Sequence, residues 1–155
     1  MGKIKALIMD VDGTLTDGSI YMGNTGELMK CFNVKDGYAI HNMLPMNGIT
    51  PIIITGRDST ILKLRCDELG IKTLIQGSAN KVQDMMMCSK KMNISLSEIA
   101  YIGDDINDLD AMKLVGLRGC PADAVNEVKS ICEFISNNEG GKGAVREFVE
   151  WILER

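Results

Sequence analysis

The sequence is poor in the residues that several common kinds of functional site require. It has a single histidine, His41, in 155 residues, which excludes a metal site built mainly from imidazole groups. Aromatic residues make up 5% of the chain, and 17 Lys and Arg are outnumbered by 21 Asp and Glu, giving a net charge of −4. Because no basic stripe dominates, we expect no nucleic-acid partner.

The cysteines show no spacing that is typical of metal or redox chemistry. None of the five forms a CxxC pair; they are Cys31, Cys66, Cys88, Cys120 and Cys132. An odd, scattered set of this kind is typical of reduced thiols that serve as small buried hydrophobic side chains.

Long apolar runs are also missing. The N-terminal apolar run stops at Asp10, which is too early for a signal peptide. The uncharged stretch 37–56 contains Pro45 and Pro51, so it fits a helix, a turn and a strand better than a membrane span. We therefore expect a cytoplasmic protein with no membrane partner, folded as a single domain over residues 1–155.

Short apolar runs alternate with helical patterns along the chain. The expected strands are 4–9, 49–54, 73–75 and 99–102, with weaker signals at 115–117 and 133–135. The expected helices are 37–46, 58–69, 79–92, 106–114, 124–130 and 142–153. This alternation predicts an α/β fold: a doubly wound, mainly parallel sheet with helices on both faces.

Residues 19–34 interrupt the alternation directly after the first strand. Two short apolar segments, 20–22 and 28–32, flank the turn sequence Gly23-Asn-Thr-Gly26. This pattern predicts an inserted β-hairpin.

Two carboxylates follow the first strand in the sequence Asp10-Val-Asp12-Gly-Thr. If both stay on the strand path, the period of two points them the same way, and they repel unless a cation lies between them. Mg²⁺ is the natural inference. A calcium-binding EF-hand loop starting at Asp10 does not fit, because Leu15 and Tyr21 stand where that loop needs Gly and Glu.

A second acidic cluster, Gly103-Asp-Asp-Ile-Asn-Asp-Leu-Asp110, follows the fourth strand. Asp104 at the strand tip is the better candidate metal ligand, and Asp108 could orient the metal's waters or hold a lysine. Asp105 and Asp110 fit equally well as ordinary acidic residues at a helix N-terminus.

Two more elements fall at the same edge of the predicted sheet. Thr55, Gly56 and Arg57 end the second strand with a hydroxyl, a flexible glycine and a guanidinium, and Lys81 opens a helix. Ligands of open α/β sheets bind at the carboxyl ends of the strands, where all these groups are expected.

Taken in order, these motifs resemble those of the haloacid dehalogenase superfamily of phosphohydrolases. The four segments that carry the resemblance are Asp10-Val-Asp12-Gly-Thr, Thr55, Lys81 and Gly103-Asp104-Asp105-Ile-Asn-Asp108. The fold implied is the superfamily's Rossmann-like core.

The resemblance implies a role for each matching residue. Asp10 would be the nucleophile that forms an aspartyl-phosphate, and Asp12 would be the general acid and base. The Asp10 side chain, the Asp12 backbone carbonyl and Asp104 would hold Mg²⁺, while Thr55 and Lys81 would grip the transferring phosphoryl group. A carboxylate is already ionised at pH 7, so the scarcity of histidine is no obstacle.

A closer resemblance extends over nearly the whole chain, to the 3-deoxy-D-manno-octulosonate 8-phosphate phosphatase family. It is carried by residues 10–18, 32–37, 53–57, 76–77, 101–105 and 140–147. That family lacks a cap domain and works as a tetramer. The hairpin at 19–34 would help to assemble it, and a neighbouring subunit would close each active site.

The resemblance also suggests residues that bind the sugar acid. Gly56 and Arg57 are the first candidates, and an arginine could pair with the carboxylate of an eight-carbon substrate. Lys142 and Arg146 could reach an anionic substrate, in the same subunit or across a subunit boundary, and they fit equally well as surface charges. The segment Lys35-Asp36-Gly37 could border the mouth of the substrate site, although Asp36 also fits a helix N-cap.

Three alternatives stay open at this point. The first is a phosphatase that acts on nine-carbon, sialic-acid-type 9-phosphates, because such relatives share this sequence type. The second is a non-catalytic regulatory domain, because the same sequence type also occurs attached to sugar-acid-activating enzymes. A nucleotide-sugar glycosyltransferase also uses Asp-x-Asp and a divalent metal, but it leaves the second acidic cluster unexplained.

Overall fold

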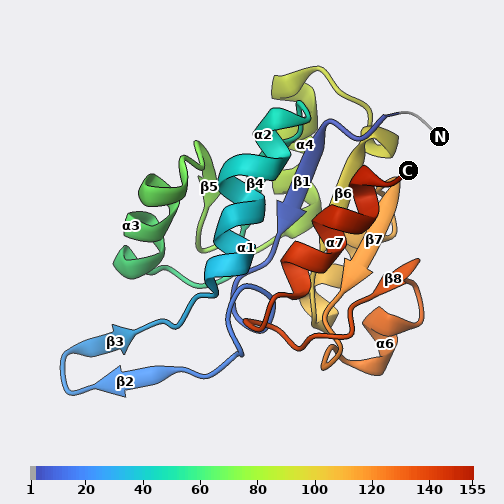
Figure 1. Cartoon of the computed structure of the whole chain (residues 1–155). Helices are drawn as coiled ribbons and strands as arrows, with labels where there is room; N and C mark the ends of the chain where they lie inside the picture. The colour runs from blue at the N-terminus through green and yellow to red at the C-terminus, as the bar shows by residue number, and fades with distance from the viewer. Residues whose placement is uncertain (1–2) are drawn as a thin grey trace.

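The computed structural model describes residues 3–155, which form one parallel sheet covered on both faces by helices (Figure 1). The sheet has six strands in the order β5-β4-β1-β6-β7-β8. Their bounds are β1 Ala6–Met9, β4 Thr50–Ile54, β5 Thr73–Ile75, β6 Ile99–Ile102, β7 Leu117–Cys120 and β8 Phe134–Ile135. The expected doubly wound α/β fold is confirmed.

β1 lies at the centre of the sheet and is fully buried. It pairs in parallel with β4 on one side and with β6 on the other. All four of its residues have 0% exposure, as expected for a parallel strand covered on both faces. The carboxyl ends of β1, β4 and β6 therefore meet at one edge of the sheet.

The helices divide between the two faces. The segment α1 to α2 and the helices α3 and α7 pack on one core cluster, and α4, α5 and α6 pack on the other. The helix bounds are α1 Val34–Tyr38, α2 Leu44–Met46, α3 Thr60–Leu69, α4 Lys81–Met92, α5 Leu109–Met112, α6 Asn126–Lys129 and α7 Ala144–Leu153. Three short helical turns complete the fold: η1 Ala39–Met43, η2 Leu96–Glu98 and η3 Ile106–Asp108.

The first helical segment starts earlier than expected and contains one wide turn. Asn33, not Asp36, is the N-cap residue, because its side chain accepts a hydrogen bond from the backbone N–H of Lys35. Within η1 to α2, the N–H of Leu44 donates to the carbonyl of Ala39, five residues back. This π-type turn precedes Pro45, which has no N–H and would crowd the carbonyl of a regular helix.

Asp36 instead ties α1 to the start of α7. It is 1% exposed, and its Oδ1 accepts a hydrogen bond of 2.8 Å from the backbone N–H of Arg146. The N-cap residue of α7, Gly143, provides no side-chain cap, so a carboxylate from another helix takes that role. Burial raises the pKa of Asp36 to about 6, against the opposing effect of the N–H groups of α7.

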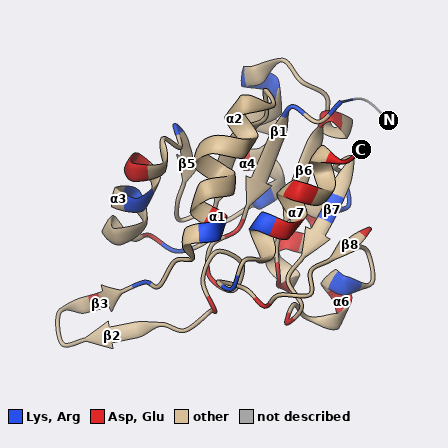
Figure 2. Ribbon diagram, in the orientation of Figure 1, with Lys and Arg blue, Asp and Glu red and all other residues tan. Residues whose placement is uncertain are grey.

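The predicted hairpin is present and projects from the sheet (Figure 1). β2 Tyr21–Gly23 pairs antiparallel with β3 Gly26–Met29, so the loop is two residues shorter than the expected turn. Residues 18–26 carry no charge (Figure 2). Large apolar side chains are exposed on the hairpin: Ile20, Tyr21, Met22, Leu28 and Met29.

The cysteines are only partly buried as small hydrophobic side chains. Cys66, Cys88 and Cys120 are buried, as expected, whereas Cys31 is exposed and Cys132 is intermediate. Within residues 3–155, none of the helices combines the length and the apolar character that crossing a membrane requires.

Candidate active site

The carboxyl ends of three neighbouring strands bring the predicted residues together. Asp10 directly follows β1, Thr55 follows β4, and Asp104 lies two residues after β6. Lys81, the first residue of α4, reaches the same place. A hollow of about 200 Å³ opens here, lined by Asp10, Asp12, Thr55, Gly56, Arg57, Asp105 and Asn107.

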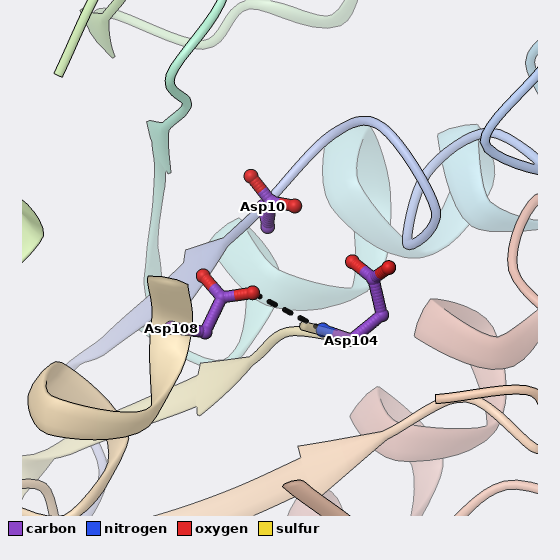
Figure 3. A group of neighbouring side chains, drawn as sticks. All are labelled: Asp10, Asp104 and Asp108. Carbon is purple, nitrogen blue, oxygen red and sulfur yellow. Dashed lines mark hydrogen bonds between the residues drawn. The ribbon is translucent and has the colours of Figure 1, made fainter. Parts of the chain in front are cut away.

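Three carboxylates crowd together at the base of the site (Figure 3). Asp10, Asp104 and Asp108 each offer an oxygen, and these atoms lie within 4.8 Å of one another. The close approach depends on Gly13, whose φ is +94° and whose position leaves no room for a Cβ: that atom would lie 2.1 Å from Oδ2 of Asp104. Glycine is therefore required at this turn.

The crowding changes the acidity of the nucleophile candidate and of Asp104. Burial, followed by the negative charge of Asp108, raises the pKa of Asp10 to about 6, although Lys81 opposes this. Burial, followed by the charge of Asp10, raises the pKa of Asp104 to about 8. Both shifts come first from burial and then from negative charge that Lys81 balances only in part.

Lys81 supplies positive charge at this site. It is 5% exposed, and its Nζ lies 2.8 Å from Oδ1 of Asp10 and 2.7 Å from Oδ1 of Asp108. Burial acts to lower the pKa of Lys81, but the two carboxylates outweigh it and the pKa is raised. The ammonium therefore stays charged beside the candidate nucleophile.

Asp108 is held in a fixed orientation by protein groups. Its Oδ1 accepts hydrogen bonds from Lys81 and from the Tyr101 hydroxyl, the latter at 2.8 Å. Its Oδ2 accepts from the backbone N–H groups of Asp104 and Asp105, at 3.2 and 3.4 Å. Burial, then the charge of Asp108, raises the pKa of Tyr101 well above its usual value, so the phenol stays a donor.

These contacts decide which carboxylates suit a cation. Both oxygens of Asp108 are engaged by donors of the chain, whereas Asp104 accepts one hydrogen bond, from Thr14 Oγ1 to Oδ1 at 2.9 Å. Asp10 and Asp104 are therefore the side chains best placed to bind a metal. A set of carboxylate oxygens with excess negative charge fits Mg²⁺, which takes one or two carboxylates together with water and phosphate oxygens.

The side chain of Asp12 points to a different set of partners. Its Oδ1 accepts a hydrogen bond of 2.6 Å from Lys30 Nζ, and its Oδ2 lies 3.9 Å from Nε of Arg57. Asp12 thus lines the mouth of the hollow but is not part of the three-carboxylate cluster. Arg57 stands at the same mouth, with 44% of its side chain exposed.

The structure does not bring Lys35, Lys142 and Arg146 to this mouth. They line a separate hollow of about 350 Å³ beside the start of α7. The Nε of Arg146 lies 2.6 Å from Oε1 of Glu150, and its guanidinium stacks over the ring of Tyr38. Within one subunit, these three cations line a hollow whose lining does not include Asp10.

The two acidic residues with open roles have local partners. Asp105 caps the turn η3, accepting a hydrogen bond of 2.7 Å from the backbone N–H of Ile106. The side chain of Asp110 is 87% exposed and lies 3.6 Å from Lys113. Both contacts are those of acidic residues at the start of a helix.

The motif order did not point to Thr14, Lys30 or Glu27 as members of the site. Thr14 lies inside the first motif, and a contact between its hydroxyl and the candidate metal ligand Asp104 could have been suspected from that position. Lys30 and Glu27 lie on or next to a hairpin strand with exposed apolar residues, so no periodic signal separates them from surface charges.

The comparisons with known proteins agree with this geometry. Residues 67–148 match the family model of haloacid dehalogenase-like hydrolases. The chain is 44% identical over 151 residues to the 3-deoxy-D-manno-octulosonate 8-phosphate phosphatase KdsC of Salmonella typhi, covering 97% of this chain and 80% of that protein.

Solved structures give the same result. The phosphatase of the same name from Yersinia pestis superposes with a TM-score of 0.94 at 42% identity, covering 97% of this chain and 81% of that one. The one from Moraxella catarrhalis, solved with a magnesium ion, a phosphate ion and a KDO molecule, gives 0.93 at 40% identity, covering 97% and 86%. This chain belongs to the 3-deoxy-D-manno-octulosonate 8-phosphate phosphatase family of haloacid dehalogenase-like hydrolases.

Proposed function

We propose that this protein is a Mg²⁺-dependent phosphatase that hydrolyses 3-deoxy-D-manno-octulosonate 8-phosphate through an aspartyl-phosphate. The observation that carries the proposal is the contact between Lys81 and Asp10 beside Asp104, at the base of an open hollow. A carboxylate nucleophile, a fixed cation and an oxygen-rich metal site are the parts that phosphoryl transfer requires.

In the first step, the carboxylate of Asp10 attacks phosphorus and the bond from phosphorus to the sugar oxygen breaks. Asp12, at the mouth of the same hollow, gives a proton to the departing alcohol. Lys81 and Thr55 hold the oxygens of the phosphoryl group during the transfer. Bound Mg²⁺ neutralises part of the negative charge of phosphate and carboxylates.

In the second step, a water molecule attacks the phosphorus of the aspartyl-phosphate. Asp12, now ionised, takes a proton from that water, and the bond between phosphorus and the Asp10 oxygen breaks. Inorganic phosphate leaves and Asp10 is regenerated. Asp108 keeps Lys81 in place throughout, because its own position is fixed by Tyr101 and by two backbone N–H groups.

Arg57 is the residue that we propose for recognition of the sugar acid. It lines the mouth, is 44% exposed, and its contacts with Asp12 and Glu27 are as long as 3.9 and 3.6 Å. An arginine so loosely held can turn to form a two-point contact with the carboxylate of the substrate. Gly56 beside it leaves space for the sugar.

The working form of the protein is a homotetramer in this proposal, with each active site close to a subunit interface. The support is the apolar hairpin: Met22 and Leu28 are 61% and 64% exposed, and the open hollow lacks a cap. Exposed apolar surface of this kind is typical of an interface. Lys35, Lys142 and Arg146 would then face a substrate bound to another subunit.

The test is steady-state phosphate release, with Mg²⁺, from the eight-carbon and nine-carbon keto-deoxy sugar acid phosphates. We expect the wild type to prefer the eight-carbon substrate and Asp10→Asn to lose at least about a thousandfold in kcat. Circular dichroism of the variant checks that the fold is intact. Undiminished turnover by Asp10→Asn would overturn the mechanism, and a preference for the nine-carbon compound would overturn the substrate.

Arg57→Ala tests the recognition step in the same assay. Loss of a charged two-point contact predicts a rise in KM on sugar acid phosphates and little change on phosphate esters without a carboxylate. An equal loss on both kinds of substrate would remove Arg57 from substrate recognition.

A further inference from the structure

Lys30 is a buried cation that reaches the active site from the hairpin. Its side chain is 3% exposed, although the two residues before it, Leu28 and Met29 at the end of β3, are exposed. Nζ lies 2.6 Å from Oδ1 of Asp12 and 3.4 Å from Oε2 of Glu27. Burying an ammonium group is costly unless it is paired, and here two carboxylates share it.

Glu27 connects this pair to the rigid core. Its Oε1 accepts a hydrogen bond of 2.5 Å from Oγ of Ser59. Ser59 is itself fixed as the N-cap of α3, where its Oγ accepts from the N–H of Leu62, and its own N–H donates to the side chain of Gln76. The side chain of Lys30 is therefore held at the far end of a chain of contacts that begins in α3.

This chain of contacts ends at Asp12, which lies in a turn after the strand β1 and not on the strand itself. An aspartate at an open mouth has more than one accessible direction, and the efficiency of a general acid depends on its reach to the leaving oxygen. Lys30 contacts Oδ1 of Asp12 closely, whereas Arg57 is much farther from Oδ2. The contact with Lys30 therefore selects one direction for the Asp12 carboxyl group.

We propose that Lys30 is a positioning residue of the reaction: it fixes the direction of the Asp12 carboxyl group, and Glu27 in turn fixes Lys30. The hairpin then acts on the chemistry of its own subunit in addition to any role in assembly. This inference rests on the acid and base role proposed for Asp12.

The test compares two substrates that differ in their need for a general acid. The alcohol of a sugar acid phosphate must be protonated to leave, whereas p-nitrophenolate leaves without a proton. Because kcat/KM covers the steps up to formation of the aspartyl-phosphate, it isolates the acid role of Asp12. A general acid contributes about 10²–10⁴-fold, so we expect Lys30→Met to lose about 10–100-fold on the sugar acid phosphate and less than about threefold on p-nitrophenyl phosphate.

A matched control and a second variant complete the experiment. Lys63→Met removes an exposed lysine on α3 and should leave both values unchanged. Glu27→Gln keeps Lys30 and Asp12 but weakens their anchor, so it should show a smaller loss with the same substrate selectivity. If Lys30→Met fails to fold, as judged by circular dichroism and by the oligomeric state, Glu27→Gln still tests the proposal.

A double-mutant cycle gives the final check. If Lys30 acts through Asp12, adding Lys30→Met to Asp12→Asn should cost little more on the sugar acid phosphate. Equal losses on both substrates, no loss, or full additivity in the cycle would overturn the inference. Failure of the wild type to hydrolyse either substrate would instead overturn the proposed function.

Discussion

Asp10 and Asp104 are two ordinary residues whose acidity is set by what surrounds them. They share a buried site with Asp108 and have one buried ammonium, that of Lys81, for three carboxyl groups. Their pKa values of about 6 and about 8 lie above the usual value of 3.8. A folded-state pKa above the unfolded one means that the folded protein holds extra protons between about pH 4 and pH 8.

This predicts how the metal-free protein and its Mg²⁺ affinity respond to pH. Because the folded state binds more protons in that window, the free energy of unfolding falls as pH rises from about 4 to about 8. Mg²⁺ binds the ionised carboxylates, so its affinity should be lower at pH 6. We expect the Kd to be at least about tenfold higher at pH 6 than at pH 8. Thermal unfolding at increasing Mg²⁺ concentration, at both pH values, measures this.

The control for this experiment is Asp104→Asn, which removes the carboxyl group with the higher pKa. The difference in Kd between pH 6 and pH 8 should shrink in the variant. Equal Mg²⁺ affinity of the wild type at the two pH values would contradict the assignment of these carboxylates to the metal.

Residues of the site were predictable where they stand at strand ends in a fixed order. Asp10, Thr55 and Asp104 each follow a short apolar run, and parallel strands bring their carboxyl ends to one edge. Lys30 could not be found this way. Its burial depends on how the hairpin folds back on Asp12 and Glu27, and that geometry leaves no spacing pattern in the sequence.

At the level of elements, the sequence predicted strands better than helix starts. The runs at 73–75 and 99–102 match β5 and β6, whereas the run expected at 115–117 starts two residues before β7 and overlaps it only at Leu117. Apolar runs mark buried strands directly. Helix starts depend on single side-chain contacts, and Asp36 looked like a cap of its own helix although it caps the distant helix α7.

Asp36 gives a prediction about the attachment of α7. Asp36→Ala removes the acceptor at the first turn of that helix and leaves its N–H groups buried without a partner. We expect the protein to lose about 1–3 kcal/mol of unfolding free energy, as for a lost N-cap or a buried unsatisfied donor. Urea unfolding measures the change.

Two further variants serve as controls for Asp36→Ala. Asp36→Asn keeps an oxygen that can accept from Arg146, so it should cost less than Asp36→Ala. Asp110→Ala removes an exposed carboxylate from another helix start and should stay within about 0.5 kcal/mol of the wild type. If Asp36→Ala were as stable as Asp110→Ala, the contact between Asp36 and the start of α7 would contribute nothing to the unfolding free energy.

At the scale of the whole molecule, the open hollow and the exposed hairpin could both be covered by one neighbouring subunit. The proposed catalytic residues Asp10 and Asp12 line a mouth that no cap domain covers within residues 3–155, so water reaches them from the open side. The hairpin extends beyond the sheet (Figure 1). Its apolar side chains are exposed to solvent. A neighbouring subunit that packs on the hairpin would cover the apolar surface and narrow the mouth in a single contact.

This predicts that assembly and activity are lost together. A stable interface buries about 800 Å² on each partner, and charges placed at its centre are strongly unfavourable. If the protein is the proposed tetramer, Met22→Lys combined with Leu28→Lys should therefore convert it to monomers in light scattering, and kcat/KM on the sugar acid phosphate should fall by about tenfold or more. Leu64→Lys, on the exposed face of α3 and 70% exposed, is the matched control, because it adds a charge away from the hairpin. Met22 and Leu28 are mostly exposed, so the doubly substituted monomer should still unfold cooperatively. A wild type that is monomeric in dilute solution and fully active would contradict the role of assembly, because the site would then be complete in one subunit.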